Sequence, residues 1–188
     1  MKKTLILSLS LALLCTFAAQ AQKTASSKAR VAQIRKMYAD AKELMKHNDN
    51  GDAPRSDMEV TACYIIPAAG STTETIHYYY ELQNDGEDGV AFYQPYFVTR
   101  KFNIAERNFY QEFLFDTERR ELVFCYGSEE NIDGGTDEVR FYWGDTGRGE
   151  TGLVHKIIKG KPAADDSLMQ KKASDLRDAL NSLINQNY

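Results

Sequence analysis

Histidine, tyrosine and glutamate stand close together in the segment TIHYYYELQ, residues 75–83. Alternate side chains of a strand point to opposite faces, so His77, Tyr79 and Glu81 share one face while Tyr78 and Tyr80 share the other. A histidine, a phenol ring and a carboxylate on one exposed face could bind a ligand by stacking and hydrogen bonds. These three residues are therefore the candidate ligand-binding residues, and the opposite face is expected to be core.

Sequence signatures of catalysis are missing elsewhere in the chain. The sequence has no G-x-S-x-G motif, only three histidines, and no two histidines or cysteines at the spacing of a zinc site. No catalytic residue, metal site or cofactor is therefore predicted, and the balance favours a non-enzyme. Paired carboxylates meet in space rather than in sequence, so a secreted carboxylate-based hydrolase stays as the alternative.

Two other motifs are better explained as turns or loops. Gly147, Gly149 and Gly152 match a G-x-G-x-x-G pattern that resembles the phosphate-covering loop of protein kinases. The other kinase motifs are absent and only 36 residues follow Gly152, so a hairpin turn is predicted. Acidic loops near residues 85–88 and 129–138 could gather oxygens around calcium, although such loops are usually just solvated.

Two cysteines, Cys63 and Cys125, lie in the predicted strand region. In an oxidising compartment they could form a disulfide, which would stabilise the fold by roughly 4 kcal/mol in the chain-entropy model. The alternative is that both are small buried hydrophobic residues in separate strands. The sequence leaves both open, because a disulfide needs Cα atoms about 6 Å apart.

The first 21 residues predict a signal peptide. Lys2 and Lys3 precede a short apolar run at residues 5–17, and Ala19 and Ala21 occupy the small-residue positions of an A-x-A cleavage site. The apolar run is shorter than the roughly 20 residues that a membrane-spanning helix needs. The segment resembles the signals of exported Gram-negative proteins, particularly those of the Bacteroidetes. This resemblance implies a secreted or periplasmic protein that is cut after Ala21.

Lipid anchoring is not expected, because Leu14 precedes Cys15 where a lipoprotein has a small residue. The whole chain has 23 basic and 27 acidic side chains, and the predicted cut removes two lysines and no acid. The remaining negative charge repels phosphate backbones and anionic lipid, so nucleic acid is not an expected partner. No later apolar run could span a membrane, so no membrane span is expected.

The order of the predicted elements is helix, about seven strands, helix. Three-and-four spacing of apolar residues predicts helices at 28–46 and 166–186, the second capped by Asp165 or Asp166. Alternating β-branched and aromatic residues predict strands at 58–66, 75–83, 92–102, 108–116, 121–127, 138–143 and 153–159. Pro95 cannot donate to a ladder, so its strand should be an edge or bulged.

These patterns predict one α+β domain over residues 22–188. Its connectors are too short for crossover helices, so the sheet should be a curved antiparallel meander of six or seven strands, with both helices on one face. Val139, Phe141 and Trp143 should be core. The preferred function is a small binding module of the bacterial cell envelope, with a protein or glycan partner. A structural envelope protein is the third alternative, with a homodimer as one possible form.

Overall fold

The computed structural model of the chain describes residues 26–46, 56–84, 91–131, 133–145 and 151–185. Several predictions fall outside these residues: the signal peptide over 1–21, the acidic loop at 85–88, and Gly147 and Gly149 of the glycine-rich turn.

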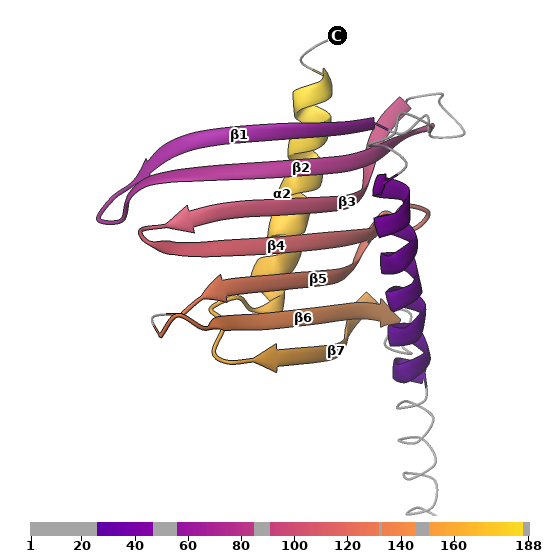
Figure 1. The fold of residues 1–188 in the computed structure, drawn as a ribbon. Helices are drawn as coiled ribbons and strands as arrows, with labels where there is room; N and C mark the ends of the chain where they lie inside the picture. Colours follow the sequence, from indigo (N-terminus) through magenta and orange to yellow (C-terminus); the bar gives the residue numbers. More distant parts are fainter. Residues whose placement is uncertain (1–25, 47–55, 85–90, 132, 146–150, 186–188) are drawn as a thin grey trace, which may run out of the picture.

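Seven strands form one open antiparallel sheet in which every strand pairs with the next along the chain (Figure 1). Each predicted strand is present, so the antiparallel meander is confirmed. The observed strands are β1 (Ser56–Ile66), β2 (Gly70–Asn84), β3 (Ala91–Ile104), β4 (Arg107–Asp116), β5 (Glu121–Glu130), β6 (Thr136–Asp145) and β7 (Thr151–Lys159).

The largest boundary difference is at the start of β2. The predicted strands leave residues 67–74 as a connector, but the turn is only three residues long, and β2 begins at Gly70. Ala68 has a φ of 66°, and the amide of Ala69 donates to the carbonyl of Ile66 at 3.1 Å. An alanine in the left-handed region is uncommon, so residue preferences do not predict this tight turn.

Two helices complete the α+β fold: an N-terminal helix at residues 26–46 and α2 (Asp166–Asn185). Both were predicted. The cap of α2 is Asp165, whose Oδ1 accepts from the amide of Leu168 at 2.8 Å. This bond satisfies one of the free amides at the start of the helix.

The prediction that both helices pack on one face of the sheet is wrong. The N-terminal helix packs on one face through Val31 and Ile34, in a cluster that includes Tyr79. Helix α2 packs on the other face, in a cluster that includes Tyr78 and Trp143. In Figure 1 the N-terminal helix lies in front of the sheet and α2 lies behind it. We call these the front face and the back face.

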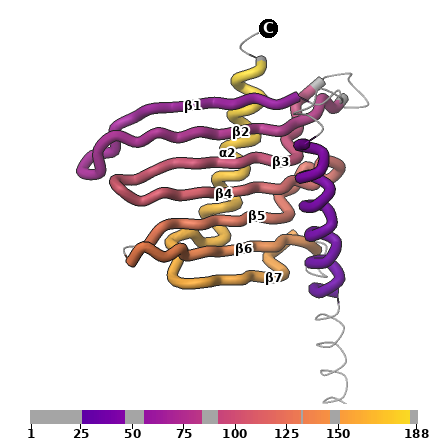
Figure 2. Tube along the Cα trace, viewed as in Figure 1, coloured from indigo at the N-terminus to yellow at the C-terminus, as the bar shows by residue number. Residues whose placement is uncertain are grey.

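The central strands explain why each face needs a helix. In β4, Phe113, Leu114 and Phe115 are all buried, although neighbours in a strand point to opposite faces. A continuous apolar run of this kind is typical of a strand that is covered on both sides. Figure 2 shows α2 crossing behind the strands, whereas the N-terminal helix crosses near one end of them.

The back-face core contains the residues that alternation predicted. Val139, Phe141 and Trp143 are all at most 1% exposed and lie in the cluster that α2 covers. Gly127 allows α2 to approach, because a Cβ at this position would lie 2.8 Å from Cε of Met169. Alanine there would force the buried terminal methyl group of Met169 to move.

Pro95 lies at a bulge, which confirms the prediction for its strand. Tyr79 pairs with Phe97 and Tyr80 pairs with Pro95, so Tyr96 is the extra residue on β3. The missing amide of proline is tolerated at such a site, because the ladder is interrupted there.

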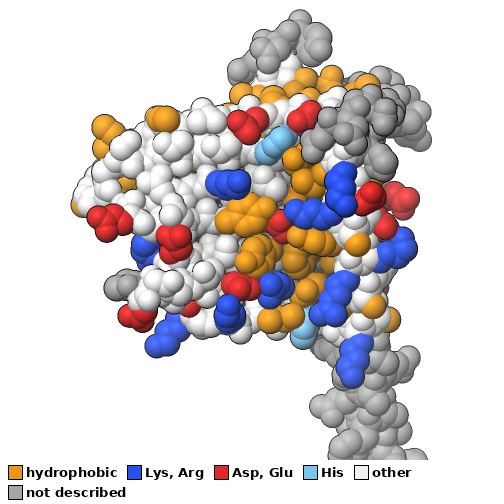
Figure 3. All heavy atoms as spheres, viewed as in Figure 1, with side chains coloured by type: hydrophobic (Ala, Val, Ile, Leu, Met, Phe, Trp, Pro, Cys, Tyr) orange, Lys and Arg blue, Asp and Glu red, His pale blue; other side chains and the backbone are white. Residues whose placement is uncertain are grey.

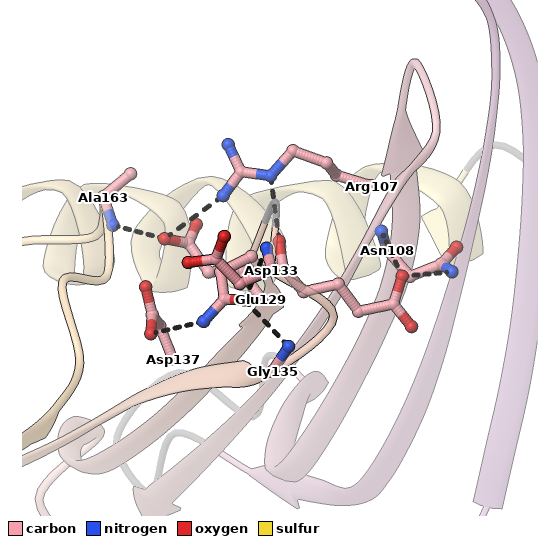
Figure 4. A network of polar contacts seen from close by, with 9 residues as sticks. Arg107, Asn108, Glu129, Asp133, Gly135, Asp137 and Ala163 are labelled. Atoms are coloured by element: carbon pink, nitrogen blue, oxygen red, sulfur yellow. Dashed lines mark hydrogen bonds and ion pairs between the residues drawn. The ribbon is translucent and has the colours of Figure 1, made fainter.

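The acidic segment at residues 129–138 binds protein donors (Figure 4). The carboxylate of Glu129 accepts from the amide of Ala163 at 2.9 Å and lies 3.5 Å from the guanidinium of Arg107. Asn131 Oδ1 accepts from the amide of Gly135 at 2.8 Å, and its amide group donates to Asp137 at 3.1 Å. These contacts tie the segment before α2 to β4 and β5.

Candidate functional site

The structure brings together two of the three predicted binding residues. The rings of His77 and Tyr79 are stacked, with centroids 4.3 Å apart. His77 Nε2 lies 2.9 Å from a carboxylate oxygen of Asp57. Tyr79 is only 7% exposed and packs in the cluster under the N-terminal helix, so it is not the outward ring that alternation predicted.

Glu81 lies in a different hollow. It lines a space of about 350 Å³ together with Asp40 and Leu44 of the N-terminal helix and Glu118 after β4. One carboxylate oxygen of Glu81 accepts from Gln83 at 3.0 Å. Residues 77, 79 and 81 share a face, but the bulge and the helix divide them into a packed stacking pair and a separate acid.

The possible disulfide is not formed. Cys63 and Cys125 are both free, the first exposed in β1 and the second fully buried in β5. Three strands lie between β1 and β5. At about 4.8 Å per strand, the two backbones are about 19 Å apart, far beyond the reach of a disulfide. Burial also raises the pKa of the Cys125 thiol, as does the negative charge of Glu112.

Cross-strand pairing arranges the front face in rows that run across the sheet. The row under the N-terminal helix is apolar and includes Phe97, Leu114, Phe124 and Tyr142. Two residues further along each strand, the row includes His77, Thr99, Glu112, Tyr126 and Arg140, and it ends at Glu59 and Ile157 on the outer strands. Figure 3 shows hydrophobic side chains gathered beside the helix, with few of them on the part of this face that lies away from it.

Glu112 is a buried carboxylate at the boundary between the two kinds of surface. It is 6% exposed, and its oxygens accept hydrogen bonds from Tyr38 at 2.7 Å, Tyr110 at 2.8 Å and Lys42 at 2.8 Å. Tyr38 and Lys42 come from the N-terminal helix, whereas Tyr110 lies beside Glu112 on β4. Burial and the bonded carboxylate raise the pKa values of both tyrosines, so their hydroxyls stay protonated as donors.

A cleft of about 370 Å³ opens beside Glu112, between the N-terminal helix and the sheet. The helix contributes Ile34, Arg35 and Tyr38. Four front-face residues complete the lining together with Glu112: Phe124, Tyr126, Arg140 and Tyr142. The cleft therefore combines aromatic rings with two guanidinium groups and one carboxylate that is already hydrogen-bonded.

An open groove of about 520 Å³ occupies the part of the front face beyond the helix. Its lining crosses β2 to β6, and the front-face side chains in it are almost entirely polar. They are Thr73, Thr75, Lys101, Asn103, Asn108, Tyr110, Ser128, Glu130 and Thr136. Tyr110 connects the two hollows, because it lines the groove and its hydroxyl binds Glu112 in the cleft.

The groove and the cleft were missed from the sequence, although one signal was present. Glu112 lies in NFYQEFLFD, where a charged residue interrupts a run of aromatic and apolar residues. An ionised side chain in such a run needs partners if the strand is buried. Its partners Tyr38 and Lys42 are about 70 residues away in the chain, so only the fold identifies them.

In the described part of the chain, no cluster of three or more histidine, cysteine, aspartate or glutamate side chains is arranged to hold a metal ion. Neither described helix has the length and apolar character needed to span a membrane. Comparison with protein-family models, curated proteins and solved structures found no match to this chain.

Proposed function

We propose that the protein is an exported binding module of the bacterial cell envelope, and that the open front-face groove holds a glycan chain. The observation that carries the proposal is the groove itself, which is about 520 Å³ in volume and crosses five strands. Export follows from the predicted signal peptide.

The chemistry of the groove suits a sugar better than a protein partner. Hydroxyl and amide side chains of Thr75, Asn108 and Ser128 can exchange hydrogen bonds with sugar hydroxyls. Tyr110 adds an aromatic ring to the same wall. A protein interface usually has an apolar centre. In the lining of the groove only Phe102, Phe109 and Tyr110 are aromatic or apolar, and the other residues are polar.

The environment of Glu112 supports binding rather than hydrolysis. A glycosidase needs one carboxylic acid that can give up a proton and a second carboxylate near it. Glu112 accepts three hydrogen bonds, from Tyr38, Tyr110 and Lys42, so both of its oxygens are already occupied by protein donors. It is the only acid that lines the cleft among the described residues. The two acids that line the groove, Glu129 and Glu130, accept hydrogen bonds from Ala163 and Asn108. This arrangement suits an anchor of the fold.

A glycan array probed with the purified protein tests the proposal. The blocking variant is Ser128→Trp, which places a large ring in the groove. Its matched control is Ser182→Trp, the same change at an exposed position on α2. Lys101→Met is a milder second variant, because Lys101 is exposed at the groove and its removal leaves the core intact.

We expect the wild type and Ser182→Trp to retain the same glycans, and Ser128→Trp to lose them while keeping its melting temperature within a few degrees. Binding that survives both groove variants would place the ligand elsewhere. An array without any bound glycan, together with hydrolysis of a model glycoside, would support the hydrolase instead.

A further inference from the structure

We infer that the cleft beside the N-terminal helix binds a carboxylate-bearing sugar residue of the glycan that lies in the groove. This inference rests on the proposed function and adds a substrate class to it: glycans that contain a uronic acid or a similar acidic sugar. It comes from the charge in the cleft, from the rings that line it, and from its position next to the groove.

The cleft has more cationic than anionic side chains in its lining. Arg35 lines it, and no hydrogen bond or ion pair joins its side chain to a described residue. Arg140 lies 2.9 Å from Glu138, but Glu138 also binds Lys159 at 3.2 Å, so one carboxylate is shared between two cations. This excess contrasts with the whole chain, which has a net charge of −4.

The carboxylate in the cleft does not cancel this charge. Glu112 is paired with Lys42 at 2.8 Å and accepts from two tyrosine hydroxyls. The cleft is therefore lined by one arginine without an ion-pair partner among the described residues, Arg35, and by one that shares its partner, Arg140. A guanidinium presents several N–H donors in a planar fork and can bind a carboxylate through two parallel hydrogen bonds.

Aromatic rings form the rest of the site. Tyr126 and Tyr142 line the cleft from neighbouring strands, and the guanidinium of Arg140 lies over the Tyr126 ring at 5.0 Å from its centroid. This contact orients the guanidinium. A sugar ring could pack against the tyrosines while its carboxylate binds Arg35 and Arg140.

The position of the cleft allows one chain to occupy both hollows. Tyr110 lines the groove, and its ring contacts Tyr126 of the cleft with centroids 6.2 Å apart. The same tyrosine donates to Glu112. A glycan in the groove would therefore reach the cleft across Tyr110 without leaving the sheet.

Isothermal titration with oligouronides tests the inference. The first ligand has free carboxylates, and the second is its methyl ester, which has the same rings without the charge. Arg35→Gln is the decisive variant, because Arg35 is exposed and supports no described contact of the fold. Arg140→Gln is the second variant, and its melting temperature is measured because it also removes the pair with Glu138.

Lys36→Gln is the matched control. Lys36 follows Arg35 on the same helix and loses the same charge, but it pairs with Asp40 and does not line the cleft. We expect the free acid to bind at least about ten-fold more tightly than the ester, as for a hydrogen bond to a charged group. Arg35→Gln and Arg140→Gln should remove this difference, whereas Lys36→Gln should preserve it.

Equal binding of the acid and the ester would overturn the inference, as would an acid preference that persists when both arginines are replaced. In either case a neutral or esterified glycan that still binds in the groove would leave the proposed function standing. A protein that binds no glycan, acidic or neutral, contradicts the proposed function as well.

Discussion

The two faces of the sheet each carry one helix, but they are used differently. On the back, α2 crosses the strands and covers an aromatic core with Trp143 and Phe113 fully buried. On the front, the N-terminal helix covers one apolar row, and a row with Glu112 and Arg140 follows it. The back face therefore stabilises the fold, whereas the front face leaves polar surface available to a ligand.

The position of each helix along the strands accounts for this difference. A helix that crosses near the ends of the strands leaves the remaining length bare (Figures 1 and 2). Bare sheet in contact with water has to be polar, and threonine, asparagine and serine serve this purpose without weakening the strands greatly. The same geometry provides a binding surface on a rigid sheet.

The largest expected loss of stability comes from a substitution in the back-face core. Replacing Trp143 with alanine removes a fully buried indole and should lower the free energy of unfolding by about 3–5 kcal/mol. Urea denaturation followed by circular dichroism measures this change. Leu168→Ala, at an exposed position on α2, should cost less than about 1 kcal/mol. Equal losses for the two variants would mean that the back face is not the main core.

The next largest loss of stability is expected at Glu112, which lies between the apolar and the polar row of the front face. Glu112→Ala leaves Lys42, Tyr38 and Tyr110 without their shared acceptor and should lower the free energy of unfolding by about 2–3 kcal/mol. Lys42 is about one third exposed, which limits the loss because water can reach its ammonium group. In a double-mutant cycle, Lys42→Met should cost less in the Glu112→Ala background than in the wild type. If the losses of the two single variants simply add in the double variant, Glu112 and Lys42 do not stabilise each other.

A smaller effect tests how closely α2 approaches the sheet. Gly127→Ala should destabilise the protein by about 1–2 kcal/mol, because the new Cβ meets Met169 at 2.8 Å and Val139 at 3.3 Å. Met169→Leu removes the atom at 2.8 Å and should recover part of this loss, which denaturant titration of the double variant measures. A neutral Gly127→Ala would show that the back face packs loosely.

The smallest expected effect is a loss of stability at neutral pH that disappears in acid. Burial alone would raise the pKa of Glu74, but the hydrogen bond and charge of Arg100 outweigh it and hold this pKa below its usual value. A lowered carboxyl pKa contributes stability above the unfolded value of about 4.3, and this contribution is lost as the pH falls through the folded pKa. The melting temperature of Glu74→Gln should therefore lie below that of the wild type at pH 7, and the gap should narrow toward pH 3. A difference in melting temperature that stays the same from pH 7 to pH 3 would contradict a stabilising ion pair between Glu74 and Arg100.

Several structural features were predictable because they depend on neighbours in the chain. Alternation in EVRFYW predicts that Val139, Phe141 and Trp143 share a buried face, and the structure confirms it. The cap of α2 and the bulge at Pro95 also follow from single residues and their conformational limits. The same alternation placed Tyr79 on the face opposite Tyr78, but it could not show that a helix covers that face too.

By itself, the sequence determined the order of the elements, the antiparallel meander and the two sides of each strand, because these depend on local preferences and short connectors. Only the tertiary structure decided which face each helix covers, and it placed Tyr38 and Lys42 on Glu112 and kept Cys63 apart from Cys125. The two contacts of Glu112 join residues that are 74 and 70 positions apart. Their formation depends on how whole elements pack, which no short window of sequence contains.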